Sequence, residues 1–245
     1  MSTGYLLVLI GAGLCLLASG YVKSTFKKYA QYGTMSNMTG AEVAQMILQK
    51  NNITDVQIGH ISGELTDHFN PSKKIVNLSD SVYGSRSVAA VAVAAHECGH
   101  VVQHDRGYLP IKFRSLLAPV ANIGSRFGLP MVIVGVILGG FAGYVNEYGQ
   151  GMGSLSIGAI LCTIGIWAFA LGTAFQIVTL PVEFNASARA LRMLDDYNIL
   201  QSGELSMGRK VLTAAALTYV AAAASSIMQL LRLILIAKGG GRRRR

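Results

Sequence analysis

Residues 4–22 read GYLLVLIGAGLCLLASGYV and contain no charged side chain. A bilayer core needs about 20 apolar residues in a helix, so this stretch has the length and composition of a membrane span. No basic residue precedes it, which is atypical of a cleaved signal peptide and favours a signal anchor. The sequence therefore predicts that its first helix fixes the chain in a membrane.

Three further apolar runs follow, at residues 127–145, 154–180 and 212–236. Only 13% of all residues are charged and 51% are hydrophobic, whereas soluble domains carry about 25% charged residues. We therefore expect a mainly α integral membrane protein with about four transmembrane helices. Its partners would include the lipid bilayer.

Glycines recur on the second and third apolar runs. Small residues repeated on one face let helix backbones approach closely in lipid, and packing of these two helices against each other is favoured over homodimerisation. The glycines are Gly135, Gly139 and Gly143 on the second run, and Gly158, Gly165 and Gly172 on the third.

The net charge of +9 does not indicate a nucleic-acid partner. The basic tail at residues 237–245 ends in four arginines, and without them the charge is +5. Nucleic-acid binding needs a basic face on a recognition fold, whereas a bias of bases next to apolar runs is typical of membrane proteins.

The placement of lysine and arginine predicts the orientation, because cytoplasmic loops carry an excess of these residues. Residues 23–126 and 181–211 would share the cytoplasmic side of a bacterial plasma membrane, while the loop at 146–153 holds an acid and no base. The basic tail would then lie outside, against the rule. The bases that support this orientation are Lys23, Lys27, Lys28, Lys112, Arg114, Arg126, Arg189, Arg192, Arg209 and Lys210.

The 23–126 region reads as a small α+β domain. Thr39 and Glu42 predict a capped helix that ends near Asn51. Short strands are expected at residues 56–58, at Ile61 and at 75–78. The last could be an exposed edge that holds an extended substrate by strand addition, or an ordinary half-buried strand. Ser85 or Ser87 then opens an Ala/Val-rich helix that stops before Gly107.

The sequence His96-Glu97-Cys98-Gly99-His100 lies within that last helix. Residues four apart lie on one helix face, so two imidazoles can hold one metal ion. Zinc suits two imidazoles and a carboxylate, and Glu97 can take a proton from the attacking water. Burying a Glu and two His in an Ala-rich helix is costly without such a purpose.

A catalytic zinc needs a third protein ligand. An unbroken helix places His104 about 12 Å from His96, which disfavours it. His60 and His68 stand alone in a turn-rich region. Glu183 follows Pro181 at the end of the third apolar run, where a renewed helix is expected. It is a better candidate than His104 for a site of the gluzincin type, with a catalytic domain of the zincin type. The alternative is an acid that the helix dipole favours at the start of that helix.

Four segments together resemble a known family. They read LTDHFNPSKKIVNLS at 65–79, AAHECGHVVQH at 94–104, PVEFNASARAL at 181–191 and LTAAALTYVAAA at 212–223. They are similar to the YugP-type neutral zinc metallopeptidases of bacterial membranes, and the resemblance covers nearly the whole chain.

This resemblance implies that His96, His100 and Glu183 bind zinc and that Glu97 is the catalytic base. The more distant HtpX and CAAX-prenyl-protease enzymes carry an Asp four residues after the third ligand. Here that position is Ser187, which leaves Asn185 and Ser187 as candidates for contacting the ligands.

The predicted function is zinc-dependent endopeptidase activity on membrane or misfolded proteins. An alternative is a membrane scaffold that binds zinc or a partner without proteolysis. The sequence leaves open whether the protein forms a homo-oligomer or has a regulatory membrane partner.

Overall fold

The computed structural model describes residues 3–138 and 157–239 of the chain. The chain divides into two compact units. The first unit comprises Met1–Leu16, Phe113–Val178 and Val220–Arg245, and the second comprises Leu17–Lys112 and Thr179–Tyr219. The predicted glycines Gly139 and Gly143, the loop at 146–153 and the Arg tail lie outside the described residues.

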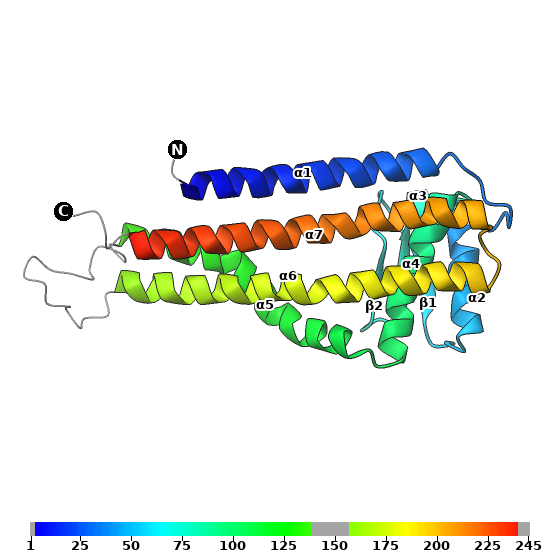
Figure 1. Ribbon diagram of the computed structural model, residues 1–245. Helices are drawn as coiled ribbons and strands as arrows, with labels where there is room; N and C mark the ends of the chain where they lie inside the picture. Colours follow the sequence, from blue (N-terminus) through cyan, green and yellow to red (C-terminus); the bar gives the residue numbers. More distant parts are fainter. Residues whose placement is uncertain (1–2, 139–156, 240–245) are drawn as a thin grey trace, which may run out of the picture. The chain divides into compact units, whose positions relative to one another are not determined.

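Four helices are long and apolar enough to cross a membrane, judged by length and composition. They are α1 (Thr3–Tyr29), α5 (Leu109–Ile137), α6 (Ile157–Asp196) and α7 (Ser202–Gly239), all drawn in Figure 1. The expected number of apolar helices is therefore found within the described residues. Each of the four links a segment of the first unit to a segment of the second.

Two predicted helix boundaries are wrong. The helix α5 begins at Leu109 rather than 127, because Pro119 and the charges before 127 do not interrupt it. The expected break at Pro181 is absent, and α6 continues through it to Asp196. A proline inside a helix removes one backbone hydrogen bond at a cost of about 3 kcal/mol. Here its neighbours Thr179 and Val182 are buried, so packing of the surrounding turn offsets that loss.

In the first unit, α5 and α6 pack through glycines. A Cβ on Gly135 would come within 2.7 Å of the Gly158 carbonyl oxygen, and a Cβ on Gly165 within 2.7 Å of the Gly128 carbonyl oxygen. A Cβ on Gly124 would approach a backbone oxygen of α6 still more closely. The predicted intramolecular packing of these two helices is thus confirmed. This seam of close glycine contacts between α5 and α6 begins N-terminally of the apolar run predicted at 127–145, because Gly124 belongs to it.

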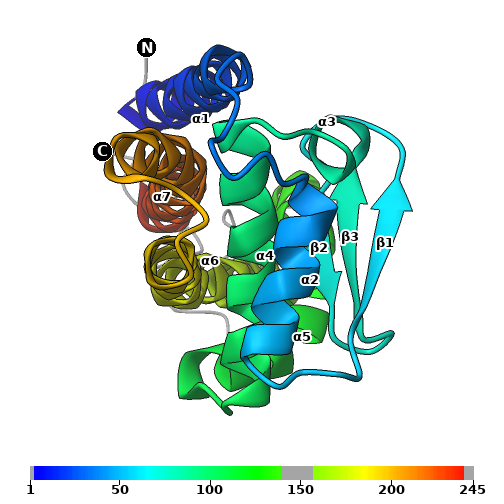
Figure 2. The same ribbon diagram turned by 90° about the vertical axis from the view of Figure 1, so that its right-hand side faces the viewer.

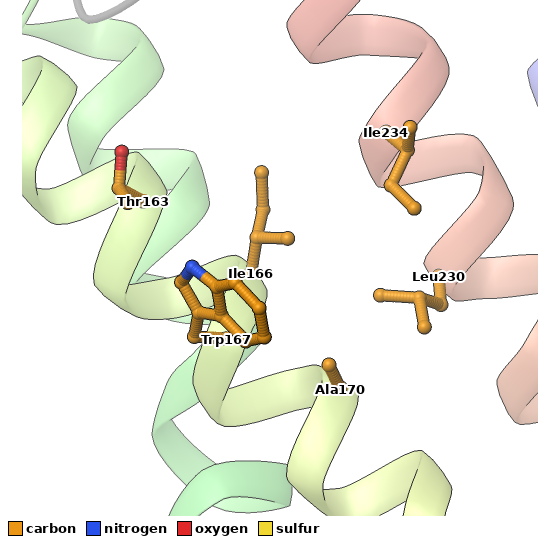
Figure 3. Close-up of a pocket in the computed structure, with 6 residues that line it drawn as sticks. All are labelled: Thr163, Ile166, Trp167, Ala170, Leu230 and Ile234. Atoms are coloured by element: carbon orange, nitrogen blue, oxygen red, sulfur yellow. The ribbon is translucent and has the colours of Figure 1, made fainter.

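An apolar pocket also lies in the first unit (Figure 3). Its wall is formed by side chains of α6 and α7, with the Trp167 indole the largest among them. The lining residues are Thr163, Ile166, Trp167, Ala170, Leu230 and Ile234.

The second unit contains a three-stranded sheet in the order β1-β3-β2. The strands are β1 (Gln57–Ile61), β2 (His68–Asn70) and β3 (Ile75–Ser79). The strand β3 pairs in parallel with β1 and antiparallel with β2. Of the two alternatives for 75–78, the exposed edge is therefore wrong, since β3 is central and its Val76 and Leu78 are fully buried.

Two helices, α2 (Gly40–Lys50) and α4 (Val88–Asp105), lie on one face of the sheet (Figure 2). The predicted capping box at the start of α2 is present, with Thr39 and Glu42 bonded reciprocally. The short helix α3 (Asp80–Tyr83) connects β3 to the start of α4. Apolar residues of α2, β3 and α4 form one core, which fixes α4 in place.

Candidate metal centre

The helix α4 presents His96 and His100 one turn apart. It begins where Ser87 Oγ accepts a hydrogen bond from the Ala90 N–H at 3.2 Å, as the sequence predicted for one of two serines. Most of the residues before the pair are buried Ala and Val. The two imidazole rings lie 4.8 Å apart, centroid to centroid, and edge to face.

Glu183 on α6 faces both rings. Its Oε2 lies 3.3 Å from Nε2 of His96 and 3.4 Å from Nε2 of His100. The side chains are nearly enclosed, with exposed fractions of 2% for Glu183, 12% for His96 and 10% for His100. The three residues proposed as ligands thus come together, with one ligand atom from each lying within 4.8 Å of the others.

The separations fit a zinc ion. Two atoms bound at about 2.1 Å to a tetrahedral zinc lie about 3.4 Å apart, close to the separation of Glu183 Oε2 from each imidazole nitrogen. Two imidazoles and one carboxylate form a donor set that zinc uses, and catalytic zinc sites keep three protein ligands. A carboxylate at this buried place also offsets part of the charge of a dication.

Gly99 lets the two ligand helices approach. A Cβ at this position would come within 2.6 Å of the Ala186 carbonyl oxygen on α6. Only glycine permits this separation, because the obstructing atom belongs to backbone. Since Ala186 lies one turn after Glu183, the contact holds the acid-bearing face of α6 against the helix of the two histidines.

Glu97 lies beside the ligand group but outside it. Its Oε2 accepts a hydrogen bond of 3.0 Å from the backbone N–H of Phe69 in β2. Burial raises the pKa of Glu97 to about 7; the negative charges of Glu183 and Asp67 add to this shift, and His96 opposes it. A bound dication would also lower that pKa. The carboxylate is therefore held by β2 next to the two imidazoles.

The second nitrogen of each imidazole also has a partner. Ser187 Oγ lies 3.1 Å from Nδ1 of His96, so the residue that replaces the Asp of the more distant enzymes contacts a proposed ligand. Gln103 Oε1 lies 3.1 Å from Nδ1 of His100. Such partners orient the rings of metal-binding histidines.

The other histidines have different surroundings. The exposed His104 packs its ring edge to face with Phe69 at 6.0 Å. His60 contacts Asp80 at 2.7 Å, and His68 lies 2.9 Å from the Thr66 carbonyl oxygen. Within the described parts of the chain, none of the three belongs to the cluster of potential metal ligands.

Sequence reasoning missed Gln103 and the backbone of Phe69. The spacing from His100 to Gln103 puts both residues on one helix face. Gln103 also follows two valines in a helix predicted to be buried, and a buried amide needs hydrogen-bond partners. The three-residue strand β2 gave no such signal, since its residues are mostly polar.

The comparisons with known proteins agree with the geometry. The family model described as "Putative neutral zinc metallopeptidase" matches residues 4–238. The chain is 39% identical over 215 residues to the "Putative membrane protease YugP" of Bacillus subtilis (strain 168), covering 88% of each protein. No solved structure matches. Zinc is the cofactor that this family implies, and His96, His100 and Glu183 form the candidate site for it. The chain therefore belongs to the family of neutral zinc metallopeptidases.

Proposed function

We propose that this protein is a membrane-embedded zinc endopeptidase of the gluzincin type, which hydrolyses peptide bonds of membrane or misfolded proteins. One observation carries the proposal: Glu183 Oε2 lies 3.3 Å and 3.4 Å from Nε2 of His96 and His100. Glu97 lies next to His96 on the same helix. A histidine pair on α4, an acid on a second helix and a small sheet beside α4 together support a zincin-like domain.

Each residue has one role in the proposed reaction. His96, His100 and Glu183 hold the zinc ion, which when bound polarises the scissile carbonyl and lowers the pKa of water towards about 7. Glu97 takes the proton of the attacking water and passes it to the leaving amine. The Phe69 N–H fixes the Glu97 carboxylate for both transfers.

The peptide substrate is proposed to lie along β2 rather than β3. In the described part of the chain, β2 pairs with β3 alone and forms one edge of the sheet. Its Phe69 N–H donates a hydrogen bond to Glu97 Oε2. An extended chain added at this edge would therefore pass the proposed base.

The second unit is proposed to face the cytoplasm. The last turn of α1 carries Lys27 and Lys28, and α6 carries Arg189 and Arg192 within the same unit. Bases concentrate on the cytoplasmic side of membrane proteins. A cysteine introduced at Asn70 should resist an impermeant thiol reagent in intact cells and react after permeabilisation, whereas the parent protein sets the background. Ready labelling of intact cells would reverse the proposed orientation.

Activity is tested with the full-length protein purified in detergent and loaded with zinc. Unfolded membrane and soluble proteins serve as substrates, and Glu97→Gln serves as the matched variant because it keeps the side-chain shape. The wild type should cleave, and Glu97→Gln should lose about a hundredfold or more of that rate while keeping the metal. Equal turnover by both proteins would contradict the role of Glu97. Zinc binding without cleavage by either would favour the alternative of a zinc-binding scaffold.

A further inference from the structure

Gln103 is fully buried on α4, close to His100 and facing α6. Its Nε2 donates to the Val182 carbonyl oxygen at 2.8 Å and to Asn185 Oδ1 at 3.0 Å. Its Oε1 lies 3.1 Å from Nδ1 of His100. One amide therefore connects a proposed ligand on α4 with the backbone next to the ligand on α6.

The orientation of this amide follows from its neighbours. A backbone carbonyl accepts hydrogen bonds and never donates them, so the NH2 group of Gln103 must face Val182. The Asn185 amide is fixed in the same way, because Arg189 Nε, which only donates, lies 2.7 Å from its Oδ1. The Gln103 oxygen is thereby turned towards His100.

This orientation determines where the proton of His100 resides. The Gln103 oxygen accepts only, so Nδ1 of His100 must carry the hydrogen. The other nitrogen, Nε2, then keeps its lone pair in the neutral imidazole. It is this nitrogen that lies 3.4 Å from Glu183 Oε2, within the cluster of ligand atoms.

We propose that Gln103 is a positioning residue that holds His100 in the one tautomer able to bind zinc through Nε2, with Asn185 and Arg189 anchoring the Gln103 amide. The inference rests on the proposed role of His100 as a ligand. His96 lacks an equivalent constraint, since the Ser187 hydroxyl at its Nδ1 can donate or accept. The two imidazoles thus differ in what fixes their tautomers.

The test measures metal binding rather than turnover, using full-length protein in detergent. Zinc and cobalt dissociation constants are measured by chelator competition, together with the visible absorption of the cobalt form. Gln103→Met keeps the approximate size and removes both hydrogen-bonding roles. We expect its zinc affinity to fall about ten- to a hundredfold, with a changed cobalt spectrum.

The matched control is Val102→Ala, which shortens the neighbouring buried side chain of α4. It should lower the melting temperature of the metal-free protein through a cavity and leave zinc affinity near that of the wild type. Gln103→Met with wild-type zinc affinity and cobalt spectrum would overturn the inference while leaving the zinc site intact. A wild type that fails to bind zinc would instead overturn the proposed function.

A second variant covers the case in which Gln103→Met does not fold. Asn185→Ala leaves Gln103 in place and removes the anchor of its amide. We expect a severalfold loss of zinc affinity, smaller than for Gln103→Met. Unchanged zinc affinity in Asn185→Ala would then overturn the inference.

Discussion

Two close helix contacts in this molecule are built alike and differ in what they bring together. In the second unit, Gly99 of α4 lies against the backbone of α6 at Ala186. In the first unit, Gly128 and Gly135 of α5 lie against the backbone of α6 near Gly165 and Gly158. The first contact aligns two imidazoles with a carboxylate, whereas the second joins apolar surfaces. Close packing therefore brings candidate metal ligands together in one place and joins apolar helix surfaces in the other.

The largest effect is expected from a variant that removes a proposed ligand beside the first contact and leaves the packing of that contact in place. Glu183→Ala takes away one of three proposed ligands while Gly99 and Ala186 remain in contact. Zinc affinity should fall by at least about ten- to a hundredfold, since that loss is seen even for residues that only support ligands. Chelator competition measures it.

His104→Ala is the control for this prediction, because His104 is exposed and contacts Phe69 rather than the ligand group. Its zinc affinity should stay near that of the wild type. Normal zinc binding by Glu183→Ala, together with a loss in His104→Ala, would reverse the assignment of the third ligand.

Gly99→Ala breaks the first contact itself. The added methyl meets the Ala186 carbonyl oxygen, so α6 must move away from the histidines. We expect lower zinc affinity together with a loss of about 1–3 kcal/mol in the free energy of unfolding, the usual cost of overpacking. Gly84→Ala is the matched control, because a Cβ there meets nothing within 4 Å. Equal zinc affinity in both variants would show that this contact does not set the site.

Gly135→Ala breaks the second contact. The methyl would meet the Gly158 carbonyl oxygen and Cys162 Sγ, so the melting temperature in detergent should fall. Zinc affinity should remain unchanged, because no proposed ligand lies in this seam. Gly13→Ala on α1 meets open space and should melt like the wild type. A change in zinc affinity of Gly135→Ala would contradict the separation of roles.

The smallest effect is expected outside both contacts. Thr39→Ala removes the capping box of α2 and should lower the free energy of unfolding by about 1 kcal/mol. Zinc affinity should not change. Denaturant or thermal unfolding measures the stability of this variant and of the Gly99 and Gly135 variants. The loss in Thr39→Ala then shows how much stability an ordinary local contact contributes.

The features predicted correctly from the sequence were those that depend on local chemistry. The four apolar runs, the cap at Thr39 and a cap at Ser85 or Ser87 each follow from a few neighbouring residues. The approach of Glu183 to the histidine pair was also anticipated, from its place after the third apolar run together with the family resemblance.

The features predicted wrongly depend on contacts between distant segments. The central place of β3 is decided by pairing with β1 and β2, which the alternation within 75–78 does not encode. The continuity of α6 through Pro181 depends on burial of the surrounding turn. The contacts of Gln103 were not predicted at all, because they required knowing that Val182 and Asn185 lie opposite it.

The strand β2 is three residues long and is followed directly by Pro71. Open sheet edges are templates on which identical chains can pair and aggregate, and proteins limit this with short edge strands and prolines. An edge of this length offers few backbone groups to another copy of the same sheet. At the β2 edge, the chain thus presents little surface for pairing with a second copy of the sheet.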